Sequence, residues 1–239
     1  YLYLKKYQNN SFDGIVSFVS KEDGGLLFNG NIDLKLKNIL NTGESFNLFW
    51  NSIGDEKQEF KVSTETQYIF NSKITPEISF SIYKQDSTFL NTKFETKLHY
   101  NISPKTKLAL TYSSESSENL KKTINNNIKT FDNRFIGFQF EHKTPKNDSF
   151  FNNKFYLKVN PSFGKRKTET NASNQFKIKT EVSYIWDLNS RNSFFIKNEV
   201  GFVNSDNFID NELFRIGGAN SIRGFNEQSI FTKKYTFSS

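Results

Sequence analysis

Apolar and polar residues alternate with a period of two along most of the chain. The segment 176–186 is a clear example, because one set of alternate positions is apolar or carries a hydroxyl group and the other is mostly charged. This pattern is typical of β-strands whose two faces meet different surroundings. About eleven such segments can be recognised, and a twelfth begins near Tyr235. They cover residues 11–20, 28–38, 44–53, 58–70, 77–86, 90–102, 106–114, 134–143, 153–164, 175–186 and 193–203.

The segments are mostly about 9–13 residues long, which suits a tilted strand that crosses a bilayer. Strands in soluble β-sandwiches are mostly about 5–6 residues long. Strands of a soluble sandwich also alternate between apolar and polar residues. In a continuous meander of this length, however, every strand has one apolar face that must be covered. Lipid covers that face in a closed barrel, which also has no open edge. The pattern therefore predicts an all-β fold, an antiparallel transmembrane β-barrel whose charged face lines a wet lumen.

The connections between the predicted strands support a barrel with two different ends. Residues 39–43, 71–76, 103–105 and 187–192 form short connections, whereas residues 115–133 and 204–234, at the opposite end, form long ones. Outer-membrane barrels have short turns at one end and longer loops at the other. The connection 144–152 is longer than this rule expects. The polar stretch 113–127 is interpreted as an exposed loop, and Pro161 predicts a bulge or a strand end.

Composition removes several other classes of protein. The hydrophobic fraction is 35%, and no apolar run is long enough for a membrane-spanning helix. The net charge is +7, but lysines are spread along the chain among acidic residues, so nucleic-acid binding is not expected. The chain has no Met and no apolar leader after Tyr1. We therefore expect a mature chain or an internal fragment of a longer protein.

Signs of catalytic chemistry are weak. The two histidines, His99 and His142, are far apart in the sequence and lack the spacing of metal ligands. The chain has no nucleophile elbow, no phosphate-binding loop and no dinucleotide fingerprint. We therefore expect a protein that is not an enzyme and that uses neither a metal nor another cofactor.

One stretch is specific. Residues 213–225 read LFRIGGANSIRGF, in which the glycines permit a tight or left-handed backbone and Arg223 offers a planar fork of donors that suits a carboxylate. The stretch closely resembles the signature loop of the bacterial surface antigen family, which comprises the BamA- and TamA-type outer-membrane barrels, with two-partner secretion transporters as relatives. In that family the loop follows the eleventh of about sixteen strands. Here it follows the eleventh predicted strand. The matching positions are Gly217, Gly218, Asn220, Ser221, Ile222, Arg223, Gly224 and Phe225.

The resemblance implies two regions. Residues 1–10 would be a linker or the end of the last periplasmic POTRA domain, and residues 11–239 would be the barrel, from the first strand to about the twelfth, with the signature loop in 204–234. The loop would fold back into the lumen, where Arg223 would pair with inner-wall residues of later strands, beyond Ser239. A solvated loop arginine is the alternative. The first strand would form a lateral gate through Phe12, Gly14, Ile15, Val16, Ser17 and Phe18.

The function that the resemblance implies is assembly, insertion or translocation of proteins at the bacterial outer membrane. The expected partners are membrane lipids, client outer-membrane or secreted proteins, and accessory periplasmic or lipoprotein subunits. A two-partner secretion transporter, which exports a dedicated protein, is the first alternative. A passive porin-like barrel and a soluble β-rich binding protein are the others. The segment before Tyr1 would separate assembly from secretion by its number of POTRA domains and the presence of a plug.

Overall fold

The chain forms one large antiparallel sheet. The structure, a computed structural model, describes residues 10–20, 25–53, 57–121, 127–146, 152–189, 191–218 and 221–239. Twelve strands pair in the order β1 to β11 followed by β14. Their bounds are β1 (Ser11–Ser20), β2 (Leu26–Lys37), β3 (Ser45–Ile53), β4 (Lys57–Glu65), β5 (Ile74–Gln85), β6 (Phe89–Ser103), β7 (Thr106–Asn119), β8 (Phe131–Pro145), β9 (Asn153–Thr168), β10 (Ala172–Asp187), β11 (Ser193–Ser205) and β14 (Lys234–Ser238).

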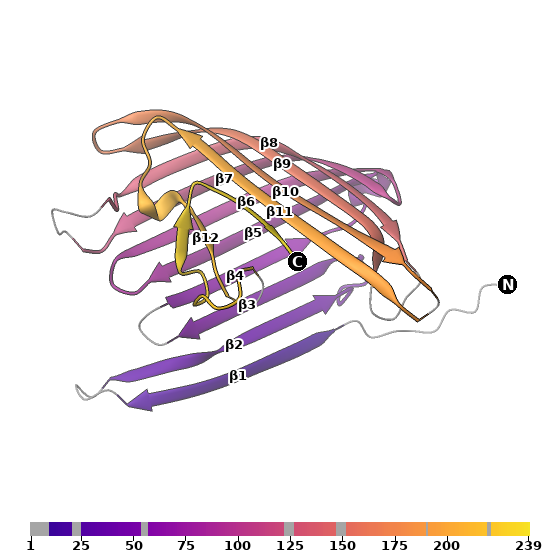
Figure 1. The fold of residues 1–239 in the computed structure, drawn as a ribbon, viewed down its shortest axis with the longest axis horizontal. Helices are drawn as coiled ribbons and strands as arrows, with labels where there is room; N and C mark the ends of the chain where they lie inside the picture. The colour runs from indigo at the N-terminus through magenta and orange to yellow at the C-terminus, as the bar shows by residue number, and fades with distance from the viewer. Residues whose placement is uncertain are drawn as a thin grey trace.

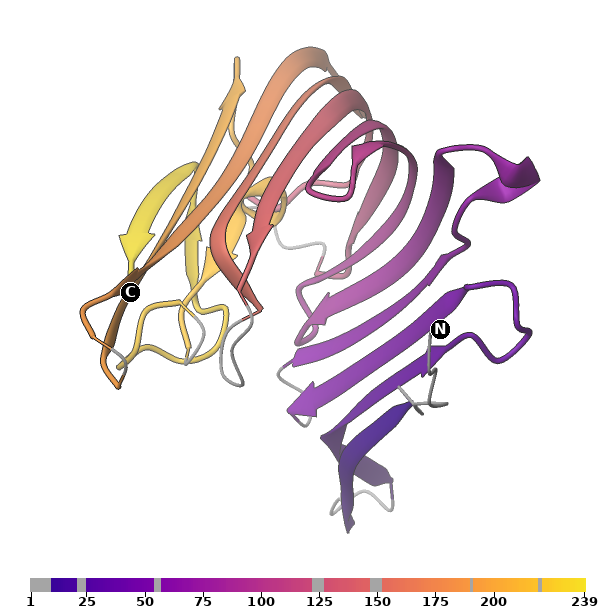
Figure 2. The same cartoon turned by 90° about the vertical axis from the view of Figure 1, so that its right-hand side faces the viewer.

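The sheet curls into an arch, with β1 at one free edge and β14 at the other (Figures 1 and 2). The prediction of an all-β, antiparallel barrel-type fold is confirmed, although the sheet is not closed. Each of the eleven predicted segments falls on one of the strands β1 to β11, and the predicted twelfth strand is β14. None of the helices that the structure describes is long and apolar enough to cross a membrane.

The two faces of the sheet have opposite chemistry. Large apolar side chains share the convex face, where the ladder places Ile136 opposite Phe163 and Phe163 opposite Phe176. Ile136 and Phe163 are both 62% exposed. Charged side chains share the concave face, where many of them are half-buried. This arrangement is the reverse of a water-soluble core, because apolar surface is left outside and charge is turned inside.

Three local predictions were wrong. The stretch interpreted as a loop from residue 113 continues as strand to Asn119. It has no apolar face because here β7 runs on past the apolar belt, so both sides of the strand are polar. The fourth strand ends at Glu65 instead of residue 70, since Tyr68 and Phe70 adopt left-handed backbone in the following turn. Finally, β9 runs through Pro161 without a bulge.

Pro161 is tolerated because only one side of its strand is affected. Its pairing with Ile178 of β10 is kept. On the β8 side the ladder skips Pro161 and Asn160, yet Gly137 pairs with Ser162 and Phe140 with Val159 in one unchanged register. Proline removes one backbone donor, and here that loss loosens a short part of one ladder instead of shifting the strand.

The connection between β11 and β14 has structure of its own. It contains a 3-10 turn, η2 (Asp210–Glu212), and two short strands, β12 (Phe214–Ile216) and β13 (Ile230–Thr232), which pair with each other. In both views this β12–β13 hairpin lies inside the arch, across the concave face of the main sheet (Figures 1 and 2). The long connection is therefore not a solvated loop but a second layer.

Candidate functional site

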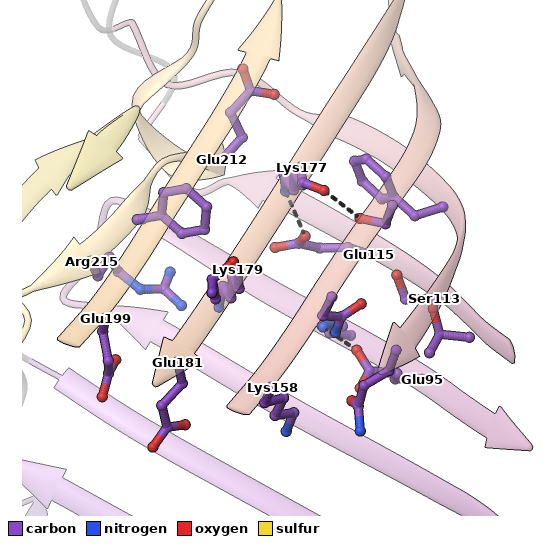
Figure 3. A pocket seen from close by; sticks show the side chains of 18 of the residues that line it. Glu95, Ser113, Glu115, Lys158, Lys177, Lys179, Glu181, Glu199, Glu212 and Arg215 are labelled. Atoms are coloured by element: carbon purple, nitrogen blue, oxygen red, sulfur yellow. Dashed lines mark hydrogen bonds and ion pairs between the residues drawn. The ribbon is translucent and has the colours of Figure 1, made fainter. Parts of the chain in front are cut away.

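The concave face and the β12–β13 hairpin enclose a cavity of about 570 Å³. Figure 3 shows that basic and acidic side chains from several strands point into it. Most of these charges are close to a partner. Lys97 Nζ is 2.7 Å from Glu77 Oε1 and 3.1 Å from Glu95 Oε1. Lys177 Nζ is 3.7 Å from Glu115 Oε2. The cavity is therefore polar and nearly charge-balanced, as in a wet lumen.

The cavity shows no sign of a metal site. No group of three or more potential ligands among His, Cys, Asp and Glu is found in the described part of the chain. His99 Nε2 lies 2.9 Å from Glu77 Oε2 on the concave face, whereas His142 Nδ1 lies 2.9 Å from Thr106 Oγ1. The two histidines thus serve separate local contacts.

The base of the hairpin is fixed by a buried ion pair. Arg166 Nη1 of β9 donates to Glu212 Oε1 at 2.5 Å, and the two side chains are 5% and 0% exposed. Gln175 Nε2 of β10 donates to the other carboxylate oxygen at 2.7 Å. The backbone N–H of Ile209 also donates to Glu212 Oε1. This carboxylate is fully buried and well supplied with donors, which is the condition for a buried charge to be stable.

A second buried group holds the same turn from its other side. Asn211 Nδ2 donates to Ser117 Oγ at 2.6 Å and to the carbonyl of Lys129 at 2.7 Å. Asn91 Nδ2 donates to the carbonyl of Asn211 at 2.8 Å. Asn211 therefore joins the turn to β6, β7 and the segment before β8. We call Asn211 and Glu212, with these partners, the latch.

Aromatic contacts hold the middle of the hairpin. Arg215 Cζ lies 3.6 Å from the ring centroid of Tyr83 on β5, a short cation–π distance. Phe231 packs edge-on against Phe89 of β6 with a centroid distance of 6.4 Å. On the other side, Phe214 packs edge-on against Tyr235 of β14 at 5.3 Å. The hairpin is therefore attached to the sheet along its length.

The predicted signature loop lies at the tip of this hairpin. The N–H of Gly217 donates to Ser221 Oγ at 2.8 Å, and the N–H of Gly218 donates to the carbonyl of Ile222. Gly217 has a φ of 119°, and a Cβ there would collide with the carbonyl of Asn226. The expectation of special backbone at these glycines is thus confirmed. The tip reaches β4, where Gln228 Nε2 donates to Glu59 Oε2 at 3.0 Å and Lys57 Nζ donates to the carbonyl of Glu227.

The other predicted loop residues have fewer contacts. Ser221 and Ile222 are half-buried, whereas Arg223, Gly224 and Phe225 are exposed. Asn220 lies outside the described residues. The docking contact of Arg223 stays a prediction, because the strands proposed to supply its partner follow Ser239. Sequence reasoning missed Asn211, Glu212 and Arg215, whose only signal is their place directly before the glycines in a long connection.

The predicted gate strand is the edge of the sheet. β1 pairs with β2 along its whole length, and its other edge has no partner strand among the described residues. Its exposed fractions include 70% for Phe12, 72% for Ile15 and 68% for Phe18, and Val16 and Ser17 are also exposed. Gly14 is half-buried opposite Ile32. Residues 1–9, proposed to end a POTRA domain, lie outside the described part of the chain.

Together, the curled antiparallel sheet, its apolar outside and its inward hairpin define a barrel-wall fold. A similar solved structure is the crystal structure of BamA from Haemophilus ducreyi lacking POTRA domains 1-3, with a TM-score of 0.60 and 16% sequence identity. The match covers 95% of this chain and 47% of that chain, so the chain spans about half of the BamA chain. At this identity the likeness concerns the fold. No family model and no curated protein sequence matches the chain.

Proposed function

We propose that this chain is the greater part of a non-enzymatic barrel that assembles, inserts or translocates proteins at a bacterial outer membrane. The observation that carries the proposal is a sheet with its apolar face outside and its charged face inside, spanned by an inward hairpin, in a fold shared with the BamA barrel. A lipid environment accounts for the outer face, and water in the lumen accounts for the inner one. A soluble binding protein would leave that apolar belt in water.

The hairpin has a mechanical role in this proposal. It bridges β4, at its tip, to β9 and β10, at its base, and so joins strands that are far apart in the sheet. Without the hairpin, only the pairing of neighbouring strands would keep the two edges of the arch in position. A strut across the concave side would keep the arch shaped while an edge opens or pairs with another strand.

The working edge would be β1. A strand edge with free N–H and C=O groups is a template for strand addition. Each of the two strands β1 and β2 contains one glycine, Gly14 and Gly30, and a glycine weakens a strand locally. Client strands would pair with this edge before they enter the membrane.

Crosslinking tests this role directly. In the full-length protein, a photo-crosslinking amino acid replaces Ile15 or Val16 on β1, or Thr96 in the middle of the sheet as a control. The reporter is a client outer-membrane protein whose last strand carries a tag. We expect adducts with the client strand at β1 and none at Thr96. Equal capture at both strands, or none at β1 while the client is still assembled, would remove the gate assignment.

A two-partner secretion transporter remains the second candidate, since the charged cavity would also suit an unfolded polar chain in transit. In that case the exported protein would crosslink to cavity residues such as Lys179 and Glu115, and β1 would not be labelled. The same crosslinking set therefore separates the two functions.

A further inference from the structure

Charge on the convex face is confined to one end. Among the strand residues that the structure describes, those that share the ladder positions of the apolar belt carry charge only near the end of the long connections. They are Lys84, Glu118, Asp132, Arg134, Lys165, Lys167 and Lys234. At the other end of the same face the ladders place aromatic residues such as Tyr100, Tyr184 and Trp186. The two rims of the belt therefore face different surroundings.

Three of the cations form a cluster on two neighbouring strands. Arg134 of β8 lies directly opposite Lys165 of β9, and Lys167 lies two residues further on. All three are exposed, and none of their side chains has a hydrogen bond or ion pair with another described residue. Asp132, opposite Lys167, is the acid nearest in register. We call Arg134, Lys165 and Lys167 the basic cluster.

The cluster is unfavourable by itself. Directly opposed residues have Cβ atoms about 4.5–5.5 Å apart, and like charges in that position destabilise a sheet. Lys167 has Asp132 opposite it, but the opposed pair Arg134 and Lys165 has no acid in its own ladder position and needs an anion from outside the chain. An arginine fork binds phosphate with two parallel hydrogen bonds, and a neighbouring lysine adds a point charge.

The position of the cluster indicates which anion. The next outward-facing pair along the ladder is Ile136 with Phe163, both 62% exposed in the apolar belt. The cluster thus lies where the acyl chains would end and the headgroups begin. When Asp132 is counted against Lys167, Arg134 and Lys165 still leave two positive charges, which fit a headgroup with two phosphates better than a phospholipid with one.

We propose that the basic cluster binds the phosphates of lipid A, the glycolipid of the outer leaflet of bacterial outer membranes. The inference rests on the proposed function, because it requires the long connections to face the outside of the cell. Binding of lipid A would also fix the orientation of the barrel, with the long connections outside the cell and the aromatic rim facing the periplasm. The bound lipid would fix the depth of β8 and β9 in the membrane.

The test measures lipid retention by the full-length protein in a non-ionic detergent, using native mass spectrometry with lipid A, phosphatidylglycerol or inorganic phosphate. The variant is Arg134→Gln/Lys165→Gln/Lys167→Gln. The control, Lys35→Gln/Lys37→Gln/Lys107→Gln, removes the same charge from the concave side. We expect lipid A affinity to fall about fivefold for each cation lost from the cluster. The control should bind as the wild type does.

Two outcomes would overturn the inference: unchanged lipid A binding in the cluster variant, or binding of phosphatidylglycerol or free phosphate as tight as that of lipid A. The single variant Lys165→Gln, with an expected loss of about fivefold, keeps the test available if the triple variant does not fold. Heat-modifiable gel migration reports folding of each protein. A wild type that folds as a barrel but retains no lipid A contradicts only this inference, whereas a wild type that never enters membranes contradicts the proposed function.

Discussion

Glu212 is the residue on which the position of the inner hairpin most depends. Its carboxylate is fully buried against Arg166 and Gln175. Glu212→Gln would leave the guanidinium of Arg166 buried without a counter-charge, at a cost of about 3–5 kcal/mol. Amide exchange in residues 209–216 should become roughly a hundred to several thousand times faster. Hydrogen exchange with mass spectrometry measures this.

The controls for Glu212 separate the ion pair from a general loss of charge. Glu118→Gln removes an exposed carboxylate and should leave exchange in the hairpin unchanged. The double variant Arg166→Met/Glu212→Met replaces the pair by apolar side chains and should recover part of the protection. Wild-type exchange in the Glu212→Gln variant would show that the latch does not hold the hairpin.

Gly217 tests the tip of the hairpin. Alanine there would be strained at a φ of 119° and would also collide with the carbonyl of Asn226. At Gly224, with a φ of 89°, a Cβ meets nothing within 4 Å. Alanine is strained at both positions because both φ values are positive, but only at Gly217 does it also collide. Gly217→Ala should therefore expose residues 217–229 to protease well before Gly224→Ala does, with a difference of about 1–3 kcal/mol from the collision. Equal protease sensitivity of the two variants would contradict the geometry described for the tip.

The sequence indicated the loop more reliably than the contacts that hold it. The glycine pattern and Arg223 could be picked out from the sequence because they resemble a family motif. The partners of Asn211, Glu212 and Arg215 are not visible, because Asn91, Tyr83 and Arg166 come close to them only after the sheet has curled. Contacts between segments that are far apart in the chain produce no periodic pattern in the sequence.

Among the elements, the turn between β2 and β3 makes a pH-dependent contribution. Hydrogen bonds to Glu44 from the Thr42 hydroxyl group and the Leu40 N–H hold the pKa of Glu44 at about 2. The folded pKa lies below the ordinary value, so the contribution is complete above about pH 4.3 and is lost as the pH falls through 2. As the pH falls between these values, protection of the Leu40 amide relative to its intrinsic exchange rate should fall more in the wild type than in Glu44→Gln, whose side chain does not titrate. Parallel pH profiles would contradict this role.

Strands could be predicted well because each one carries its own alternation, independent of its neighbours. The ends were harder to predict. β7 runs on to Asn119 with polar residues on both sides, and the chain after Glu65 turns through left-handed residues that carry no glycine signal. Apolar and polar residues alternate only in the part of a strand that has lipid on one face and water on the other. The alternation is lost where both faces meet water.

For the whole molecule, we propose that the convex face lies in lipid and the concave face in water. The chain contains no cysteine, so single cysteines can be introduced without background. β6 suits this measurement, because Phe94, Thr96 and Leu98 share the apolar belt and Lys93, Glu95 and Lys97 lie on the cavity side.

The decisive measurement is labelling of these six single-cysteine variants with a membrane-impermeant maleimide, in the full-length protein reconstituted in liposomes. We expect a strict period of two, with fast labelling at 93, 95 and 97 and protection at 94, 96 and 98. Uniform labelling along β6, or protection at the odd positions and reaction at the even ones, would contradict it.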